Sequence, residues 1–276
     1  MKISRLREYA EAVATSYLDN IVAWHRQRAA EDARDWRDRR HEGVKTRASF
    51  RAALVRLPGA PVAVIGELKR RSPSKGWLAP ELDVVTMARR YAESGAAAIS
   101  VLTDVEFFAG ALGDLEVVAA NVATPLLRKD FTVSENDVLD ARDAGASAIL
   151  LITTALSDEE LVRFQMLARE VGLDALVEVH DHVEAARALD AGANLIGVNQ
   201  RDLQTFEVDP AHAASVVEAI RADGVVTVCE SAVSTVDDVQ RAADAGYDAV
   251  LVGEAFVTAA DPGATVRAFA SIRPLP

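Results

Sequence analysis

Residues 62–76 read VAVIGELKRRSPSKG, an apolar run that ends in alternating charges and leads into a polar loop. Glu67 and Lys69 stand two positions apart, so on a strand both side chains project from the same face. A run that is apolar on both faces is typical of a strand in a parallel sheet. The loop lacks the G-x-G-x-x-G pattern of an open dinucleotide-binding sheet. This segment therefore favours a closed barrel over an open doubly wound sheet.

The same unit recurs along the chain as an apolar run, a polar end, a helical pattern and often a glycine. The runs that we interpret as strands are residues 62–68, 97–103, 125–131, 148–153, 175–180, 194–199, 225–230 and 249–253. Stretches such as 159–171 and 183–191 carry apolar residues at three- and four-residue spacing, which is typical of amphipathic helices. Eight such strands alternating with helices predict an α/β fold, the (β/α)8 TIM barrel.

Helix boundaries are marked as well. Ser134, Ser157 and Thr235 each precede an acidic residue by two or three positions, as helix N-caps do. Glycines that can adopt the left-handed conformation at helix ends are Gly95, Gly145, Gly172, Gly192, Gly224 and Gly246. We therefore expect the helices between the strands to begin and end at these residues.

Residues 1–56 precede the first strand and are predicted to form an N-terminal helical extension that packs on the barrel. Apolar residues at helical spacing there are Leu6, Ala10, Val13, Tyr17, Ile21 and Trp24. Residues 57–276 are predicted to form the catalytic barrel, and no linker separates the two parts. We expect a single domain overall, because 276 residues leave no room for a second barrel.

Composition narrows the classes of function. The net charge of −12 argues against nucleic acid as a partner, since such binding depends on neutralising phosphates. No apolar run reaches the roughly 18 residues that cross a bilayer, and the N-terminus lacks the apolar core of a secretory signal, so we expect a cytoplasmic protein with no membrane partner. The single cysteine, Cys229, lies in an apolar run and is predicted to be a buried strand residue.

Polar residues end most of the predicted strands. They are Glu67, Lys69, Lys129, Glu178, Asn199, Arg201 and Glu230. In a (β/α)8 barrel the carboxyl ends of the strands meet at the active-site face. Cations and carboxylates in one mouth can supply a general acid, a general base and an anion clamp, because neighbouring charges shift each other's pKa.

The last two strand ends predict a phosphate site. Ser231 and Ala232 follow the seventh strand, Gly253 and Glu254 follow the eighth, and these loops are the usual phosphate site of the barrel. Ser72 in the first loop is a further candidate donor, and residues 73–76 are placed to close over the mouth. We predict no metal site, since the H-x-H pair His180 and His182 is better explained by ordinary loop and helix-start positions.

Six stretches carry a resemblance to a known family. They read ELKRRSPSKG, SVLTDVEFFAG, LLRKDF, LVEVH, GVNQRDLQTFEVD and VLVGEAF. In order and spacing they resemble the motifs of the indole-3-glycerol phosphate synthases of tryptophan biosynthesis, from about Val62 to Phe269. The resemblance implies a carboxy-lyase that converts 1-(2-carboxyphenylamino)-1-deoxyribulose 5-phosphate to indole-3-glycerol phosphate, releasing carbon dioxide and water. It implies no cofactor, and we expect a monomer or weak homodimer.

The resemblance also implies roles. Lys129 would be the general acid of ring closure, Glu178 the base or acid of dehydration, and Lys69 a contact to the anthranilate carboxylate. The implied catalytic set is Glu67, Lys69, Lys129, Glu178, Asn199 and Glu230. The implied substrate-binding set is Ser72, Phe108, Phe131, Arg201, Ser231, Ala232, Leu251, Gly253 and Glu254.

One position departs from the family, which usually has Ser-Gly-Ile where this chain has Ser231-Ala232-Val233. If the middle residue needs a positive φ, alanine is strained there by roughly 1 kcal/mol, and phosphate affinity falls. Two alternative functions stay open at this point. One is a non-catalytic barrel paralogue that binds phosphorylated ligands or acts in assembly. The other is a barrel like phosphoribosylanthranilate isomerase, which uses a cysteine as its acid, and Cys229 stands on the wrong strand for that role.

Overall fold

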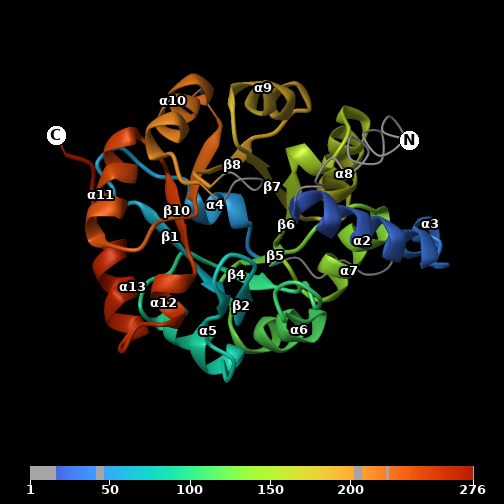
Figure 1. Cartoon of the computed structure of the whole chain (residues 1–276), viewed down its shortest axis with the longest axis horizontal. Coiled ribbons are helices and arrows are strands. Elements are labelled where there is room, and N and C mark those ends of the chain that lie inside the picture. The colour runs from blue at the N-terminus through green and yellow to red at the C-terminus, as the bar shows by residue number, and fades with distance from the viewer. Residues whose placement is uncertain (1–16, 42–46, 202–206, 222–223, 276) are drawn as a thin grey trace, which may run out of the picture.

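The structure is a computed structural model that describes residues 17–41, 47–201, 207–221 and 224–275. Eight parallel strands close into a barrel in the order β1-β10-β9-β8-β7-β6-β5-β4 (Figure 1). They are β1 (Ala63–Leu68), β4 (Ala98–Leu102), β5 (Leu126–Lys129), β6 (Ala148–Ile152), β7 (Asp174–Val179), β8 (Leu195–Asn199), β9 (Val226–Glu230) and β10 (Ala249–Val252). The predicted TIM barrel and all eight predicted strands are confirmed.

Helices surround the barrel as an outer layer (Figure 1). The main ones are α5 (Val84–Glu93), α6 (Leu112–Asn121), α7 (Glu135–Asp143), α8 (Asp158–Glu170), α9 (His182–Asp190), α10 (Pro210–Ile220), α11 (Val236–Ala245) and α13 (Pro262–Ala270). Two short elements, the 3-10 turn η1 (Thr153–Ala155) and α12 (Glu254–Val257), follow β6 and β10. One apolar core lies between strands and helices, and a second fills the barrel interior.

The predicted helix boundaries are confirmed except at Gly224, because α10 already ends at Ile220 with Arg221 as its C-cap. Ser134, Ser157 and Thr235 are the N-caps of α7, α8 and α11, and each forms a reciprocal capping box with the acidic residue three positions later. All six predicted helix-end glycines have positive φ. Local sequence signals therefore set where these helices start and stop.

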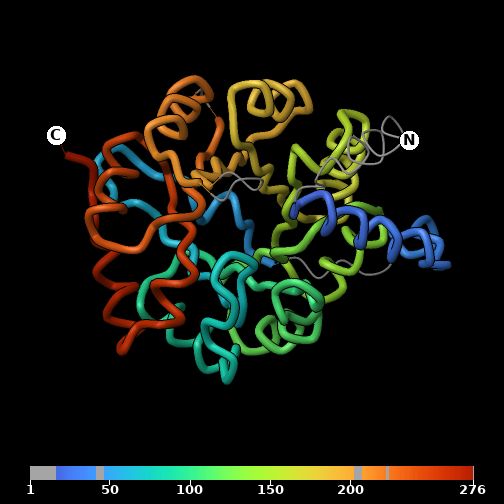
Figure 2. Tube along the Cα trace, viewed as in Figure 1, coloured from blue at the N-terminus to red at the C-terminus, as the bar shows by residue number. Residues whose placement is uncertain are grey.

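The N-terminal segment forms α2 (Tyr17–Glu31), α3 (Trp36–Arg39) and α4 (Phe50–Leu54). Figure 2 shows α2 beside α7 and α8 on the outside of the barrel, and Arg26 and Arg28 of α2 pair with Glu160 and Asp137 of those helices. Phe50 and Leu54 are fully buried in the interior core and close one end of the barrel. Of the predicted apolar stripe, Leu6, Ala10 and Val13 lie outside the described residues.

The segment after β1 is more ordered than the expected loop. Residues 71–77 form a small antiparallel hairpin of β2 (Arg71–Ser72) and β3 (Gly76–Trp77). Arg70 binds the Asp114 carboxylate of α6, and Arg71 donates to the carbonyl oxygens of Glu106 and Phe107. These long-range contacts hold the hairpin at the mouth of the barrel.

None of the helices in the described part of the chain has the length and apolar composition that a membrane span requires.

Candidate active site

A cavity of about 810 Å³ opens at the carboxyl ends of the strands. Every residue that the sequence predicted for the site contributes to its lining. They are Glu67, Lys69, Ser72, Phe108, Lys129, Phe131, Glu178, Asn199, Arg201, Glu230, Ser231, Ala232, Leu251, Gly253 and Glu254. The parallel barrel brings these residues together because all its strands end at the same face.

Glu67 and Lys69 form an ion pair at the end of β1, with 2.5 Å between Lys69 Nζ and Glu67 Oε1. Gly253 makes room for this pair, because a Cβ at that position would collide with the Glu67 carboxylate and press on Lys69. The buried Glu67 carboxylate thus stands in the cavity beside a cation, in the two-apart arrangement expected from the strand.

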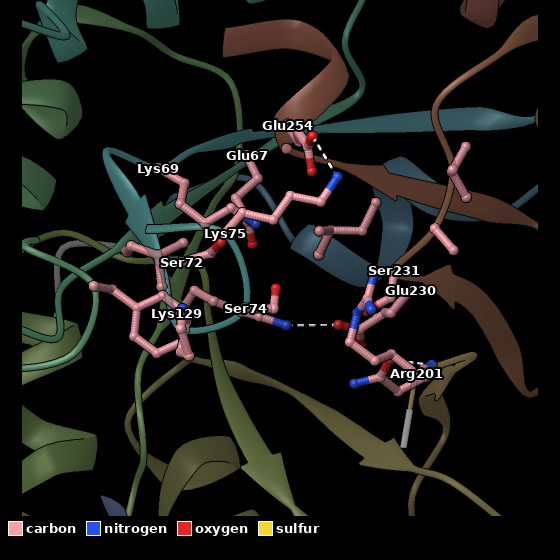
Figure 3. A pocket seen from close by; sticks show the side chains of 18 of the residues that line it. Glu67, Lys69, Ser72, Ser74, Lys75, Lys129, Arg201, Glu230, Ser231 and Glu254 are labelled. Atoms are coloured by element: carbon pink, nitrogen blue, oxygen red, sulfur yellow. Dashed lines mark hydrogen bonds and ion pairs between the residues drawn. The ribbon is translucent and has the colours of Figure 1, made fainter. Parts of the chain in front are cut away.

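Lys129 lies between two buried carboxylates at the centre of the site. Its Nζ is 2.6 Å from Glu230 Oε2 and 3.3 Å from Glu178 Oε2 (Figure 3). Burial alone would lower the pKa of the Lys129 ammonium, but Glu230, Glu178 and Glu67 outweigh burial and raise the pKa above its ordinary value. Lys129 is therefore a charged ammonium at neutral pH.

Glu178 is the carboxylate that the site keeps ionised. Burial favours its protonated form, but Lys129 and His180 oppose this, and the Asn199 amide donates a hydrogen bond of 3.0 Å to its Oε1. Together they lower the pKa of Glu178 below its ordinary value. A buried carboxylate that stays ionised beside an ammonium can act as a base.

Glu230 differs from Glu178. Burial raises the pKa of its carboxyl to about 7, since the ammonium of Lys129 only partly offsets burial and the carboxylates of Glu178 and Glu67. Gly197 on β8 leaves space for this side chain, because a Cβ there would collide with Glu230 Oε1. Within the described part of the chain this oxygen has no hydrogen-bond partner, so it can accept a bond from a substrate hydroxyl.

One wall of the cavity is aromatic. The rings of Phe108 and Phe131 lie 6.3 Å apart with 40° between their planes. Leu251 of β10 adds an apolar side chain to the cavity lining. An aromatic substrate ring can pack against such a wall, while the charged strand ends face its polar groups.

The loops after β9 and β10, where the sequence predicts a phosphate site, form another part of the cavity lining. Ser231 and Ala232 both have positive φ, 64° and 54°, directly after β9, which places alanine in the strained region that the sequence raised as a concern. Gly253 is the N-cap of α12. Glu254, the first residue of α12, pairs with Lys75 of the hairpin at 2.7 Å (Figure 3). Lys75 thus has a specific partner.

The H-x-H pair His180 and His182 has separate hydrogen-bond partners. His180 binds Glu184 and lies 3.7 Å from Glu178, whereas His182 contacts Ser215. Their different partners do not form a shared site. Burial opposes the charged imidazole of His180, but Glu184 and Glu178 outweigh it and raise the pKa of His180. Sequence reasoning did not foresee that the His180 side chain lies beside Glu178.

Sequence reasoning also missed a buried group of three side chains next to the aromatic wall. His25 of α2 meets Asp104 and Asp130, which follow β4 and β5. The rule of polar strand ends would have found the two aspartates, since TD and KD close the runs SVLTD and LLRKD. No local signal marks His25, because its role depends on where α2 packs.

The fold is a (β/α)8 barrel, and its strand ends bring ammonium and carboxylate side chains together in one cavity, as in a barrel enzyme. Solved structures with the same fold include 3-hexulose-6-phosphate synthase from Salmonella typhimurium, with a TM-score of 0.61, 16% identity, and coverage of 76% of this chain and 97% of that one. Thiamine phosphate pyrophosphorylase from Pyrococcus furiosus has a TM-score of 0.59, 16% identity, and coverage of 80% and 96%. At these identities the likeness shows the fold alone.

Sequence comparison is more specific. A family model for indole-3-glycerol phosphate synthase matches residues 18–269. Similar proteins of that name occur in a Nocardioides species, 46% identical over 91% of this chain and 97% of that protein, and in a Parafrankia species, 49% identical over 77% and 79%. The chain belongs to the indole-3-glycerol phosphate synthase family, which comprises carboxy-lyases of tryptophan biosynthesis.

Proposed function

We propose that the cavity closes the indole ring of 1-(2-carboxyphenylamino)-1-deoxyribulose 5-phosphate, with Lys129 as the general acid. The observation that carries this assignment is the position of Lys129 Nζ, 2.6 Å from Glu230 and 3.3 Å from Glu178. The ammonium stands in the same cavity as the aromatic wall and the loops after β9 and β10 that we propose bind phosphate. A substrate with an aromatic ring at one end and a phosphate at the other can span that space.

In the first step the ring carbon that bears the carboxylate bonds to the ketone carbon of the sugar chain. The ketone oxygen takes a proton from Lys129, and the nitrogen becomes an iminium. The raised pKa of Lys129 supports this role, because it keeps the ammonium protonated while the substrate binds. Holding the two carbons in contact is the other contribution of the site.

In the second step the bond to the carboxylate breaks and its electron pair returns to the ring and the iminium nitrogen, releasing carbon dioxide. The hydroxyl left on the former ketone carbon then departs as water, with Lys69 assisting the proton transfer. Glu178, whose pKa is lowered, takes the proton of the adjacent methylene. Glu67 holds Lys69 in place through their ion pair.

The remaining residues bind the substrate in this proposal. Phe108 and Phe131 pack against its ring, and Asn199, Arg201 and Glu230 orient its hydroxyls and carboxylate. Phosphate contacts would come from Ser72, Ser231, Ala232, Gly253 and Glu254, mostly through backbone N–H groups. Arg201 follows the end of β8, where its backbone N–H donates to the Asn199 side chain.

A fluorescence assay tests the proposal directly. The purified full-length chain mixed with the carboxyphenylamino-deoxyribulose phosphate is expected to generate indole emission and one carbon dioxide per indole, with no added metal or cofactor. Absence of indole at high enzyme concentration would refute the reaction. Carbon dioxide without indole emission would instead place the error in the dehydration step.

The isomerase alternative lacks its acid. Cys229 is buried, does not line the cavity, and receives a contact from the Gln200 amide. Burial, with Glu230 and Asp238, raises the pKa of its thiol well above the ordinary value. The predicted buried cysteine is confirmed, and it stands away from the proposed chemistry.

We further propose that the chain works in the cytoplasm as a monomer or weak homodimer that binds no nucleic acid and no membrane. The net charge of −12 supports the absence of nucleic-acid binding, since such binding depends on neutralising phosphates. We also propose that residues 1–56 and 57–276 act as one unit, supported by the burial of Phe50 and Leu54 inside the barrel. Light scattering over a range of concentrations tests the oligomeric state. A single unfolding transition is expected if residues 1–56 and 57–276 act as one unit.

A further inference from the structure

Three buried side chains connect the N-terminal helix to the aromatic wall of the cavity. His25 Nε2 lies 2.8 Å from Asp104 Oδ2 and 3.9 Å from Asp130 Oδ1. All three residues are at most 5% exposed. A buried hydrogen bond therefore joins the His25 ring to the Asp104 side chain.

Each aspartate holds a residue of the aromatic wall. Asp104 Oδ1 accepts the backbone N–H groups of Phe107 and Phe108, at 2.6 and 2.9 Å. Asp130 Oδ1 accepts the backbone N–H of Phe131 at 2.8 Å. Asp130 also directly follows Lys129, so the same strand end carries the proposed general acid.

His25 touches the wall directly as well. Its ring centroid lies 5.2 Å from that of Phe131. Trp24 packs edge-on against both His25 and Phe107. The His25 ring thus packs against both Trp24 of α2 and Phe131 of the aromatic wall.

A metal ion is the competing explanation for two aspartates and a histidine. The carboxylate oxygens are already engaged, since Asp130 Oδ2 accepts from Thr103 Oγ1 at 2.5 Å and from Arg128 at 2.9 Å. The buried Arg128 guanidinium supplies the countercharge that a cation would otherwise provide. The group is therefore a hydrogen-bond network.

We propose that His25 is a positioning residue of the active site, which acts through Asp104 and through its ring contact to set Phe108 and Phe131. This inference rests on the ring-binding roles proposed for those two phenylalanines. Without the imidazole, Asp104 Oδ2 loses its hydrogen-bond partner in a buried setting, and the turn that Asp104 ties to Phe108 relaxes. Small displacements of groups that orient a substrate have large effects on rate.

Two matched substitutions of His25 test whether the hydrogen bond to Asp104 matters, as opposed to the polarity or size of the side chain. His25→Gln can place an amide N–H near the position of Nε2, whereas the shorter side chain of His25→Asn cannot reach Asp104. Arg26→Ala is the control, because Arg26 anchors the same helix through Glu160 and the Ala155 carbonyl, and neither of these partners lines the cavity. All variants are assayed where circular dichroism shows them folded.

We expect His25→Asn to lower kcat/KM about tenfold, mainly by raising KM, and His25→Gln to stay within about threefold of the parent. Arg26→Ala should lower Tm and leave KM within about twofold. Equal KM values in His25→Asn and Arg26→Ala would overturn the inference, as would a His25→Gln no better than His25→Asn.

Phe108→Ala and Phe131→Ala separate this inference from the function on which it rests. Both should raise KM more than His25→Asn does. If they raise KM while His25→Asn behaves like Arg26→Ala, only the role of His25 is wrong. If their KM is unchanged, the ring-binding roles fail, and the inference fails with them.

Discussion

Lys129 Nζ lies 2.6 Å from Glu230 Oε2, and the two residues stand on strands β5 and β9, which are diametrically opposite in the barrel. The pair therefore crosses the mouth between residues 101 positions apart in sequence. Such a contact requires a closed barrel. In an open sheet β8, β7 and β6 would lie between the two strands and hold the two side chains apart. It places a charged ammonium at the centre of the cavity.

Lys129→Ala should lower kcat at least 100-fold, on the order expected for loss of a general acid, with substrate still bound. Indole fluorescence measures the rate, and competition by the product measures binding. Full activity of Lys129→Ala would show that another group protonates the ketone. Loss of binding together with activity would assign Lys129 to substrate binding instead.

His180→Gln should shift the acidic limb of the kcat/KM profile to higher pH. The positive imidazole helps to lower the pKa of Glu178, so its removal raises that pKa and leaves less ionised base at acidic pH. Activity on the acidic side falls several-fold, while the plateau changes less than about twofold. His182→Gln, two residues away and in contact with Ser215, is the control. Identical profiles for the two variants would contradict the coupling.

Glu230→Gln should become more stable relative to the parent as pH rises. The pKa of Glu230 is about 7 in the folded chain against 4.5 ordinarily, so the folded state holds this proton more tightly and loses stability between those two values. Glutamine has no proton to lose there. Thermal unfolding from pH 4 to 8 should show the difference growing by about 1 to 3 kcal/mol. Glu116→Gln, exposed on α6, is the control; a flat difference for Glu230→Gln would refute the assignment.

Ala232→Gly should lower KM with less effect on kcat. The φ of 54° strains alanine by about 1 kcal/mol, and glycine relieves this strain, while its freer unfolded chain costs about 0.4 to 1 kcal/mol. Tm should therefore change little, and a backbone that adjusts freely should hold phosphate more tightly. Inhibition by inorganic phosphate reports this separately from ring binding. A higher phosphate inhibition constant would show that alanine preorganises the site.

Lys75→Gln should raise KM about two- to fivefold, because the Glu254 carboxylate beside the proposed phosphate site is then no longer neutralised. Both side chains are about half exposed, so the effect should weaken with added salt. Adding Glu254→Gln should restore KM, since it removes the repelling charge. A double variant as impaired as Lys75→Gln would show that Lys75 acts without Glu254.

Much of the site could be predicted from the residues themselves. Glu67 and Lys69 share a face because strand side chains alternate, and Lys129 and Glu178 reach the same mouth because parallel strands end together. Their roles stay predictions until the variants are assayed. The ordered hairpin with Lys75 was not foreseen, because contacts such as Arg70 with Asp114 join segments that have no shared local pattern.

Local patterns in the amino-acid sequence were enough to predict the strands, the helix caps such as Ser134 and the set of strand-end residues, because period, capping and turn preferences act over a few neighbouring residues. The contact of Lys129 with Glu230 across the barrel and the packing of the His25 ring against Phe131 depend on the tertiary structure. It also separated the pKa of Glu178 from that of Glu230, since burial and the distances between charges exist only after the barrel closes.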